Sequence, residues 1–273
     1  MAKTKKKLEA YLVASDAAHR TSLDSYATCP GKTFLSYVCD AHDAFVHCEN
    51  KFTTKQDGTY NKDSEESLRH ISCALLGTIM GHFETFQKTL FAGLLERTGY
   101  LPAFDTEHFF KGLKKVTDRD VSISPARLMA FRKLNAPVGL VLADSLNSWH
   151  DPVRVGSYVR AILPASNCFD SSAVEDLSVL WQLRHSIVHT GAWLTFPDAQ
   201  KVLPLSTWGG KAIIFEHTFV NAVARRFHLI VQACNANIQG AVTKALGNAP
   251  QQETVDSFAE FLQVSSPKAV WLA

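Results

Sequence analysis

The segment between residues 177 and 191, LSVLWQLRHSIVHTG, holds residues suited to acid–base chemistry on an anion. Histidine gains and loses a proton near neutral pH, so His185 and His189 can serve as general base or acid. Arginine stays charged and presents a planar fork that matches phosphate oxygens, so Arg184 can clamp a phosphate. Together these residue types suit cleavage of a phosphodiester without an obligatory metal ion.

Helical spacing decides which of these side chains can meet. His185 and His189 are four residues apart and therefore share one helix face. Arg184 and His189 are five apart, and five steps of about 100° end roughly 140° away from the start. One copy of the segment therefore spreads over more than one face, which favours half of a shared cleft over a complete pocket.

Two plainer explanations of this segment are open. Arg184 and His189 could be surface cations near a helix C-terminus, where the helix dipole favours positive charge. His185 and His189 could instead bind a metal, as histidines four apart do in zinc helices. A metal site would need a third ligand, and the segment lacks the Glu of the H-E-x-x-H pattern.

Long amphipathic helices are expected to position these residues. Apolar side chains recur at helical spacing in four long stretches, 32–50, 64–98, 171–190 and 217–246. Shorter helices are expected at 4–20, 106–113, from 125, at 138–149, from 152 to before Pro164, and at 252–262. A short β-hairpin is expected near 202–215, around Gly209 and Gly210. The predicted fold class is all-α, a multi-helix bundle.

Composition narrows the function classes only slightly. The chain has 273 residues, enough for a single helical domain over 1–273, and its net charge of +2 is too small to indicate a nucleic-acid partner by itself. No apolar run approaches the roughly 18 residues of a membrane span, so we expect no membrane association and a cytoplasmic location. The six cysteines contain no C-x-x-C pair, so free and mostly buried thiols are expected.

The segment RHSIVH, residues 184–189, resembles the Arg-x4-His signature of the HEPN superfamily of ribonucleases, whose second position is commonly Asn, Asp or His. Its surroundings also resemble that family: Gly191, a loop with Asp198, the branched segment KAIIF and a long helix follow it. The earlier stretch LLGTIMGHFETFQKTLFAGLLE resembles the other member of the family's central helix pair. A HEPN-like core at about 64–246 would then carry an insertion at 100–170, a helical extension at 1–55, and a C-terminal helix and tail at 250–273.

The resemblance implies a metal-independent endoribonuclease that needs no cofactor. The RNA 2′-hydroxyl would attack the adjacent phosphate and leave 2′,3′-cyclic phosphate and 5′-hydroxyl ends. Arg184 and His189 would be catalytic, and His185 would orient His189, bind phosphate or donate a proton. The implied partners are RNA, a second copy that completes the active site, and an antitoxin or regulatory protein, as for a toxin or defence effector.

Three further residues are candidates for supporting roles. Glu84 lies among aromatic and apolar residues, where a buried carboxylate needs a partner, so it either braces Arg184 or is exposed. Arg225 and Arg226 either contact the RNA backbone or form a solvated face. The alternative function is a non-catalytic HEPN-like module for nucleotide binding or dimerisation, or a bundle whose N-terminal helices bind a protein partner.

Overall fold

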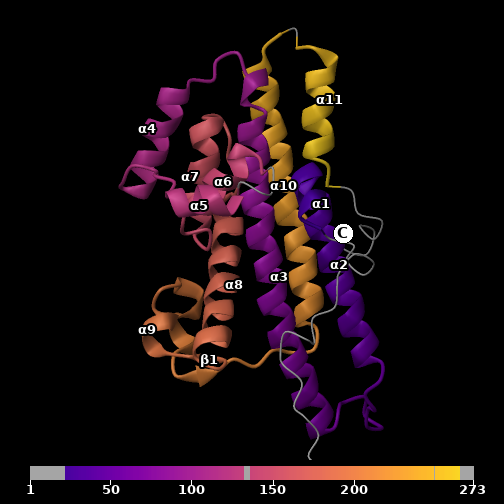
Figure 1. The fold of residues 1–273 in the computed structure, drawn as a ribbon. Helices are drawn as coiled ribbons and strands as arrows, with labels where there is room; N and C mark the ends of the chain where they lie inside the picture. Colours follow the sequence, from indigo (N-terminus) through magenta and orange to yellow (C-terminus); the bar gives the residue numbers. More distant parts are fainter. Residues whose placement is uncertain (1–21, 132–135, 249, 265–273) are drawn as a thin grey trace, which may run out of the picture.

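A computed structural model describes residues 22–131, 136–248 and 250–264, and within these ranges the chain is mostly helical (Figure 1). The all-α prediction is confirmed. The predicted helix at 4–20 lies outside the described residues. The α-helices are α1 (Leu23–Thr28), α2 (Pro30–Glu49), α3 (Lys62–Glu96), α4 (Thr106–Thr117), α5 (Pro125–Phe131), α6 (Val138–Ser145), α7 (Pro152–Ile162), α8 (Ser171–His189), α9 (Phe196–Ala199), α10 (Phe219–Leu246) and α11 (Gln252–Phe261).

The longest of these helices, α3, is the axis of the bundle. The Asn61 side chain caps it by accepting a hydrogen bond from the amide of Ser64 at 2.8 Å. Helices α1, α2, α6, α7, α8 and α10 all contact it. In Figure 1, α8 runs along one side of α3, and α2 and α10 run along the other. Helices α6 and α7, which belong to the predicted insertion at 100–170, pack directly on α3.

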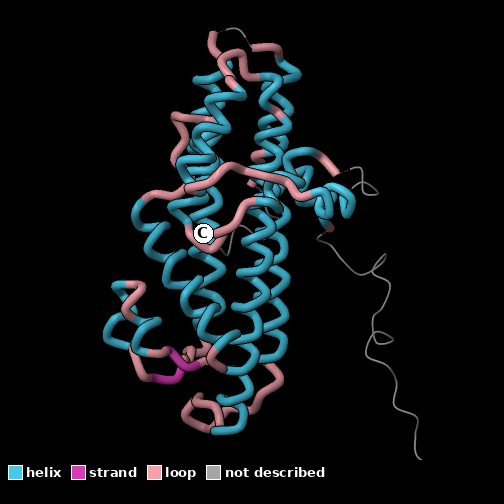
Figure 2. Tube along the Cα trace, turned by 60° about the vertical axis from the view of Figure 1, so that its left-hand side comes forward, coloured by secondary structure: helices cyan, strands magenta, loops and turns pink. Residues whose placement is uncertain are grey.

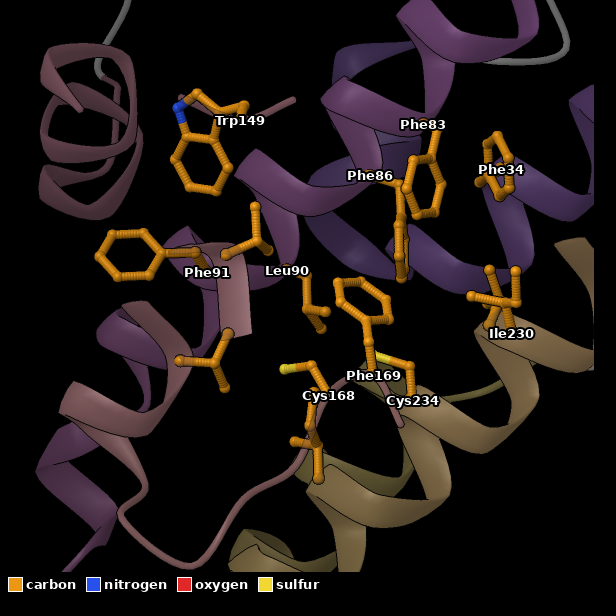
Figure 3. Close-up of a cluster of buried hydrophobic side chains, with 14 of the residues drawn as sticks. Phe34, Phe83, Phe86, Leu90, Phe91, Trp149, Cys168, Phe169, Ile230 and Cys234 are labelled. Carbon is orange, nitrogen blue, oxygen red and sulfur yellow. The ribbon is translucent and has the colours of Figure 1, made fainter. Parts of the chain in front are cut away.

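An aromatic cluster fills the centre of the bundle. Phe83 of α3 lies 5.3 Å from Phe34 of α2 and 4.9 Å from Phe227 of α10, measured between ring centroids. Figure 3 shows Phe34, Phe83 and Phe86 together in this core. Trp181 joins the cluster from α8, with its ring centroid 6.4 Å from that of Phe83. Trp181 is 5% exposed, so α8 is anchored to α3 only one helical turn before Arg184.

The predicted cysteine chemistry agrees with the structure. All six cysteines are free of disulfide bonds, and four of them are buried. Cys168 and Cys234 lie beside the aromatic core in Figure 3. These thiols are core side chains, as the sequence indicated.

The predicted β-hairpin is in the wrong place. The two short strands are β1 (Trp193–Leu194) and β2 (Lys211–Ala212), paired antiparallel with Trp193 opposite Ala212. The residues just before Gly209 and Gly210, where the predicted hairpin needed a strand, form a 3-10 helix, η3 (Leu203–Trp208). Another 3-10 helix, η2 (Thr98–Tyr100), follows α3. Gly210 still makes the turn, with φ of 76° and its amide bonded to the Leu194 carbonyl at 2.8 Å. Figure 2 shows the strands at one end of the bundle.

Within the described ranges, none of the helices combines the length and the apolar composition that crossing a bilayer would require.

Candidate active site at the end of helix α8

Helix α8 carries the proposed catalytic segment at its C-terminal end. The Asp170 side chain caps its start by accepting a hydrogen bond from the amide of Ala173 at 2.8 Å. Leu177, Leu180 and Trp181 bury its inner face. Gly191, with φ of 64°, takes the left-handed conformation that lets the chain leave the helix. The helix therefore ends just after His189 and leaves that end open to solvent.

The two histidines meet as their spacing predicted. The ring centroids of His185 and His189 are 4.6 Å apart, and both side chains are exposed. Partial desolvation, followed by the neighbouring His189, lowers the pKa of His185 below its usual value. A lowered pKa keeps the His185 imidazole neutral at pH 7, so one of its ring nitrogens can accept a proton.

Arg184 is half-buried and has no partner for its charge. No ion pair or hydrogen bond to a described residue involves its guanidinium, and its Nε is buried without a hydrogen-bond acceptor. A buried donor left unsatisfied costs about 1–3 kcal/mol, and an anion bound at Arg184 would supply the missing acceptor. The Nε of Arg97 is also buried and unsatisfied, but the Arg97 guanidinium has other contacts, whereas that of Arg184 has none among the described residues. The Arg184 side chain is therefore placed to bind an anion that none of the described residues provides.

The Arg184 side chain lines an open cavity of about 440 Å³ between α8 and the start of α7. His150, Asp151, Trp181, His185 and Lys201 also line it. Asp151 is occupied elsewhere, because it caps α7 at the amides of Val153 and Arg154. Two permanent cations, Arg184 and Lys201, therefore face this space together with two histidines, and the cavity suits a phosphate-bearing ligand.

Lys201 is held at the cavity by a buried carboxylate. Asp198 is 7% exposed and accepts a hydrogen bond from Lys201 Nζ at 2.7 Å and from the Thr195 hydroxyl at 2.9 Å. These two bonds, that from Lys201 first, lower the pKa of Asp198 below its usual range. Asp198 therefore stays charged at neutral pH and restrains a lysine that is 59% exposed.

Neither alternative that the sequence left open for Glu84 is what the structure shows, because Glu84 is half-buried and pairs with residues other than Arg184. Glu84 Oε2 lies 2.8 Å from Nε2 of His150, and Glu84 Oε1 lies 2.6 Å from Nζ of Lys88. The hydrogen bond from His150, followed by that from Lys88, lowers the pKa of Glu84 to about 2. Glu84 still reaches the site, but through His150, whose ring packs on Trp181 with centroids 4.3 Å apart.

Arg225 and Arg226 are exposed on α10, away from the residues that line the cavity. Arg226 Nε lies 3.2 Å from Asp176 Oδ2 on α8. Asp176 precedes Arg184 by eight residues, about 12 Å along the helix axis. The structure therefore does not bring these two arginines to the candidate site.

The sequence-based interpretation missed His150 and Lys201. His150 comes from the loop before α7, where the only local signal is the helix start at Asp151 and Pro152. Lys201 follows α9 and is placed by the Thr195–Asp198–Lys201 contacts. No short motif links either residue to RHSIVH, and only the packing of α7 and α9 beside α8 reveals them.

Across the described residues, no three His, Cys, Asp or Glu side chains gather closely enough to hold a metal ion, so the zinc alternative at His185 and His189 lacks a third ligand there.

In comparisons with known proteins, no family model, no curated protein and no solved structure matches this chain.

Proposed function

We propose that this protein is a metal-independent endoribonuclease whose active site is the cavity beside the end of α8. The observation that carries the proposal is the unpartnered Arg184 guanidinium, which lines a cavity next to the paired rings of His185 and His189. A cation beside imidazoles suits phosphodiester cleavage, because the cation can stabilise the developing negative charge and the imidazoles can transfer protons. The resemblance of RHSIVH to the HEPN signature is consistent with it.

The residues divide the reaction between them. Arg184 and Lys201 bind the non-bridging oxygens of the scissile phosphate and stabilise the negative charge that develops there. The His185–His189 pair takes the proton from the 2′-hydroxyl as its oxygen bonds to phosphorus. The bond from phosphorus to the 5′-oxygen breaks as that oxygen takes up a proton, which leaves a 2′,3′-cyclic phosphate and a 5′-hydroxyl. The lowered pKa of His185 favours its neutral form, which can accept a proton, and the ring of His189 lies beside it.

We also propose that two copies associate at this end of the molecule. Apolar side chains near the motif are exposed: Val188 at 53%, Trp193 at 49% and Phe196 at 68%. A surface of this kind favours association with another apolar surface. A second copy would cover it and bring two sets of Arg184 and His189 to one cleft. Light scattering across a concentration series should show a dimer that Phe196→Asp weakens.

The cavity also favours a second candidate, a module that binds nucleotides without cutting RNA. Its volume of about 440 Å³ and its cations would suit a nucleotide equally well. The two candidates differ in turnover: a binding module retains its ligand, and His189→Ala changes little.

The decisive experiment incubates the purified protein with RNA in EDTA. We expect cleavage by the wild type, and a loss of about 10²-fold or more for Arg184→Ala and His189→Ala. Matched controls are Arg160→Ala and His70→Gln, since both residues are exposed and neither lines the cavity. A strict need for a divalent metal, or equal loss in the controls, would refute the proposal.

The cellular setting that fits such an enzyme is a toxin or defence effector held in check by an antitoxin or regulatory protein. Induced expression should stop growth of a bacterial host, and expression of Arg184→Ala should not. Equal toxicity of both forms would argue against this setting.

A further inference from the structure

His150 is placed at the cavity by two contacts on its two sides. Its Nε2 lies 2.8 Å from Glu84 Oε2 on α3, and its ring packs on Trp181 of α8 at 4.3 Å between centroids. Its side chain is 51% exposed, so it is not a core residue. A histidine fixed on two sides and open on a third, beside an anion-binding cavity, is oriented for a ligand.

The chemistry of the Glu84–His150 pair assigns a task to each ring nitrogen. Glu84 also lies 2.6 Å from Lys88 Nζ, and its pKa of about 2 keeps it a carboxylate at neutral pH. A carboxylate can only accept, so Nε2 of His150 carries the hydrogen of this bond. The other nitrogen, Nδ1, makes no hydrogen bond to a described residue. Nδ1 is therefore the atom of His150 that can exchange a proton with a ligand.

The positions of Trp181, Arg184, His185 and His189 in the sequence give their order along the axis of α8. His150 packs on Trp181, His185 follows Trp181 by four residues, and His189 follows by eight. These steps are about 6 Å and 12 Å along the helix axis. Arg184 lies between Trp181 and His189 in this order. A phosphate bound to Arg184 would thus have the His185–His189 pair toward one end of the helix and His150 toward the other.

Transesterification needs such a pair of proton-transfer groups. The attacking and leaving oxygens lie on opposite sides of phosphorus, so the base and the acid must also lie on opposite sides. In one chain, His150 lies against Trp181, and the His185–His189 pair lies toward the C-terminal end of α8. No residue from a second copy is then required for the acid.

We propose that His150 is the general acid of the reaction and that Glu84 is its positioning residue, an inference that rests on the proposed ribonuclease function. The His185–His189 pair takes the 2′-hydroxyl proton, the O2′–P bond forms and the P–O5′ bond breaks. The proton on Nδ1 of His150 moves to the 5′-oxygen, which leaves as a hydroxyl. His150 ends neutral, with Nε2 still bonded to Glu84, and water restores its proton.

The first test is single-turnover cleavage by His150→Gln, whose amide can still donate to Glu84 but cannot deliver a proton. We expect cleavage of ordinary RNA to slow by about 10²-fold or more, with little change in RNA affinity. The matched control His70→Gln changes an exposed histidine on α3 outside the cavity and should leave the rate unchanged.

A substrate with sulfur in place of the bridging 5′-oxygen separates an acid from a structural residue. A thiolate leaves without protonation, so His150→Gln should cut this substrate at nearly the wild-type rate. Arg184→Ala should stay slow on both substrates. Equal slowing of His150→Gln on both substrates, or full activity on ordinary RNA, would overturn the assignment.

Glu84→Gln tests the positioning role. On ordinary RNA we expect Glu84→Gln to slow cleavage less than His150→Gln does, because the proton donor remains but is less well placed. On the substrate with the bridging 5′-sulfur, Glu84→Gln should cut at nearly the wild-type rate. Equal slowing of Glu84→Gln on both substrates would contradict the positioning role. If wild-type protein fails to cut RNA at all, the ribonuclease proposal itself fails, which is a different outcome from any of these.

Discussion

Replacing Arg184 by methionine separates a catalytic arginine from a structural one. Methionine keeps an unbranched stem of similar packing but removes the guanidinium. The Arg184 guanidinium makes no ion pair or hydrogen bond to a described residue, and its buried Nε is unsatisfied. Since an unsatisfied buried donor costs about 1–3 kcal/mol, its removal should leave the free energy of unfolding unchanged or raise it by about 1 kcal/mol.

The rate of RNA cleavage, unlike the stability, should fall when Arg184 is replaced. Loss of one donor to a developing oxyanion costs about 10²–10³-fold in rate, or roughly 2.7–4 kcal/mol in transition-state free energy. Arg184→Met should therefore fold at least as stably as the wild type and cut RNA at least about 100-fold more slowly. Urea unfolding followed by circular dichroism, and single-turnover cleavage, measure the two quantities.

Arg97→Met is the matched control for this experiment. The Arg97 side chain is also half-buried, and its Nε is likewise without a hydrogen-bond acceptor, but its Nη1 donates to the Gly93 carbonyl at 3.0 Å and its guanidinium lies 4.1 Å over the Phe261 ring. Its loss should cost about 1–2 kcal/mol of stability and leave cleavage unchanged. If Arg184→Met loses as much stability as Arg97→Met, the reasoning about an unpartnered cation is refuted.

Four further outcomes follow from the same contacts. Asp198→Ala removes the bonds to Lys201 and Thr195 and should cost about 1–2 kcal/mol in urea unfolding. Lys201→Met should lower by about one the slope of log RNA affinity against log salt concentration. Arg226→Met should leave this slope unchanged, because the wild-type Arg226 guanidinium pairs with Asp176. Gly139→Ala would place a Cβ 2.4 Å from the Ala92 carbonyl oxygen and should lower the free energy of unfolding by about 1–3 kcal/mol, because α6 can no longer pack as closely on α3. Gly77→Ala is the control, since its Cβ would meet nothing within 4 Å and should cause no such loss. The pKa of Glu84 falls from 4.5 to about 2 on folding, so the Glu84 carboxylate stabilises the fold fully above pH 4.5 and loses this effect as the pH falls toward 2. The difference in unfolding free energy between wild type and Glu84→Gln should therefore vanish between pH 4.5 and pH 2.

Local signals predicted the helices and the ends of α8 well. Capping side chains and apolar spacing act over a few residues, so α7 begins at Pro152 and α8 ends just before Gly191, as expected. The pairing of His185 with His189 also followed from helical spacing alone. In each case the determining contacts lie within one or two turns of the chain.

Features that depend on distant contacts could not be predicted. The strand partner of Lys211 is Leu194, across the η3 segment, and not a neighbour across Gly209 and Gly210. Glu84 meets His150 across 66 residues, because α3 and the loop before α7 pack together, and no local pattern encodes that contact. The sequence left Glu84 either bracing Arg184 or exposed, and the structure pairs it instead with His150 and Lys88.

The most direct test of the central claim is the chemistry of the RNA ends left by the purified protein in EDTA. Attack by the 2′-hydroxyl under the control of Arg184 and the histidines predicts 2′,3′-cyclic phosphate and 5′-hydroxyl ends, absent with Arg184→Ala. Products with 5′-phosphate and 3′-hydroxyl ends, or no cleavage until a divalent metal is added, would contradict the account.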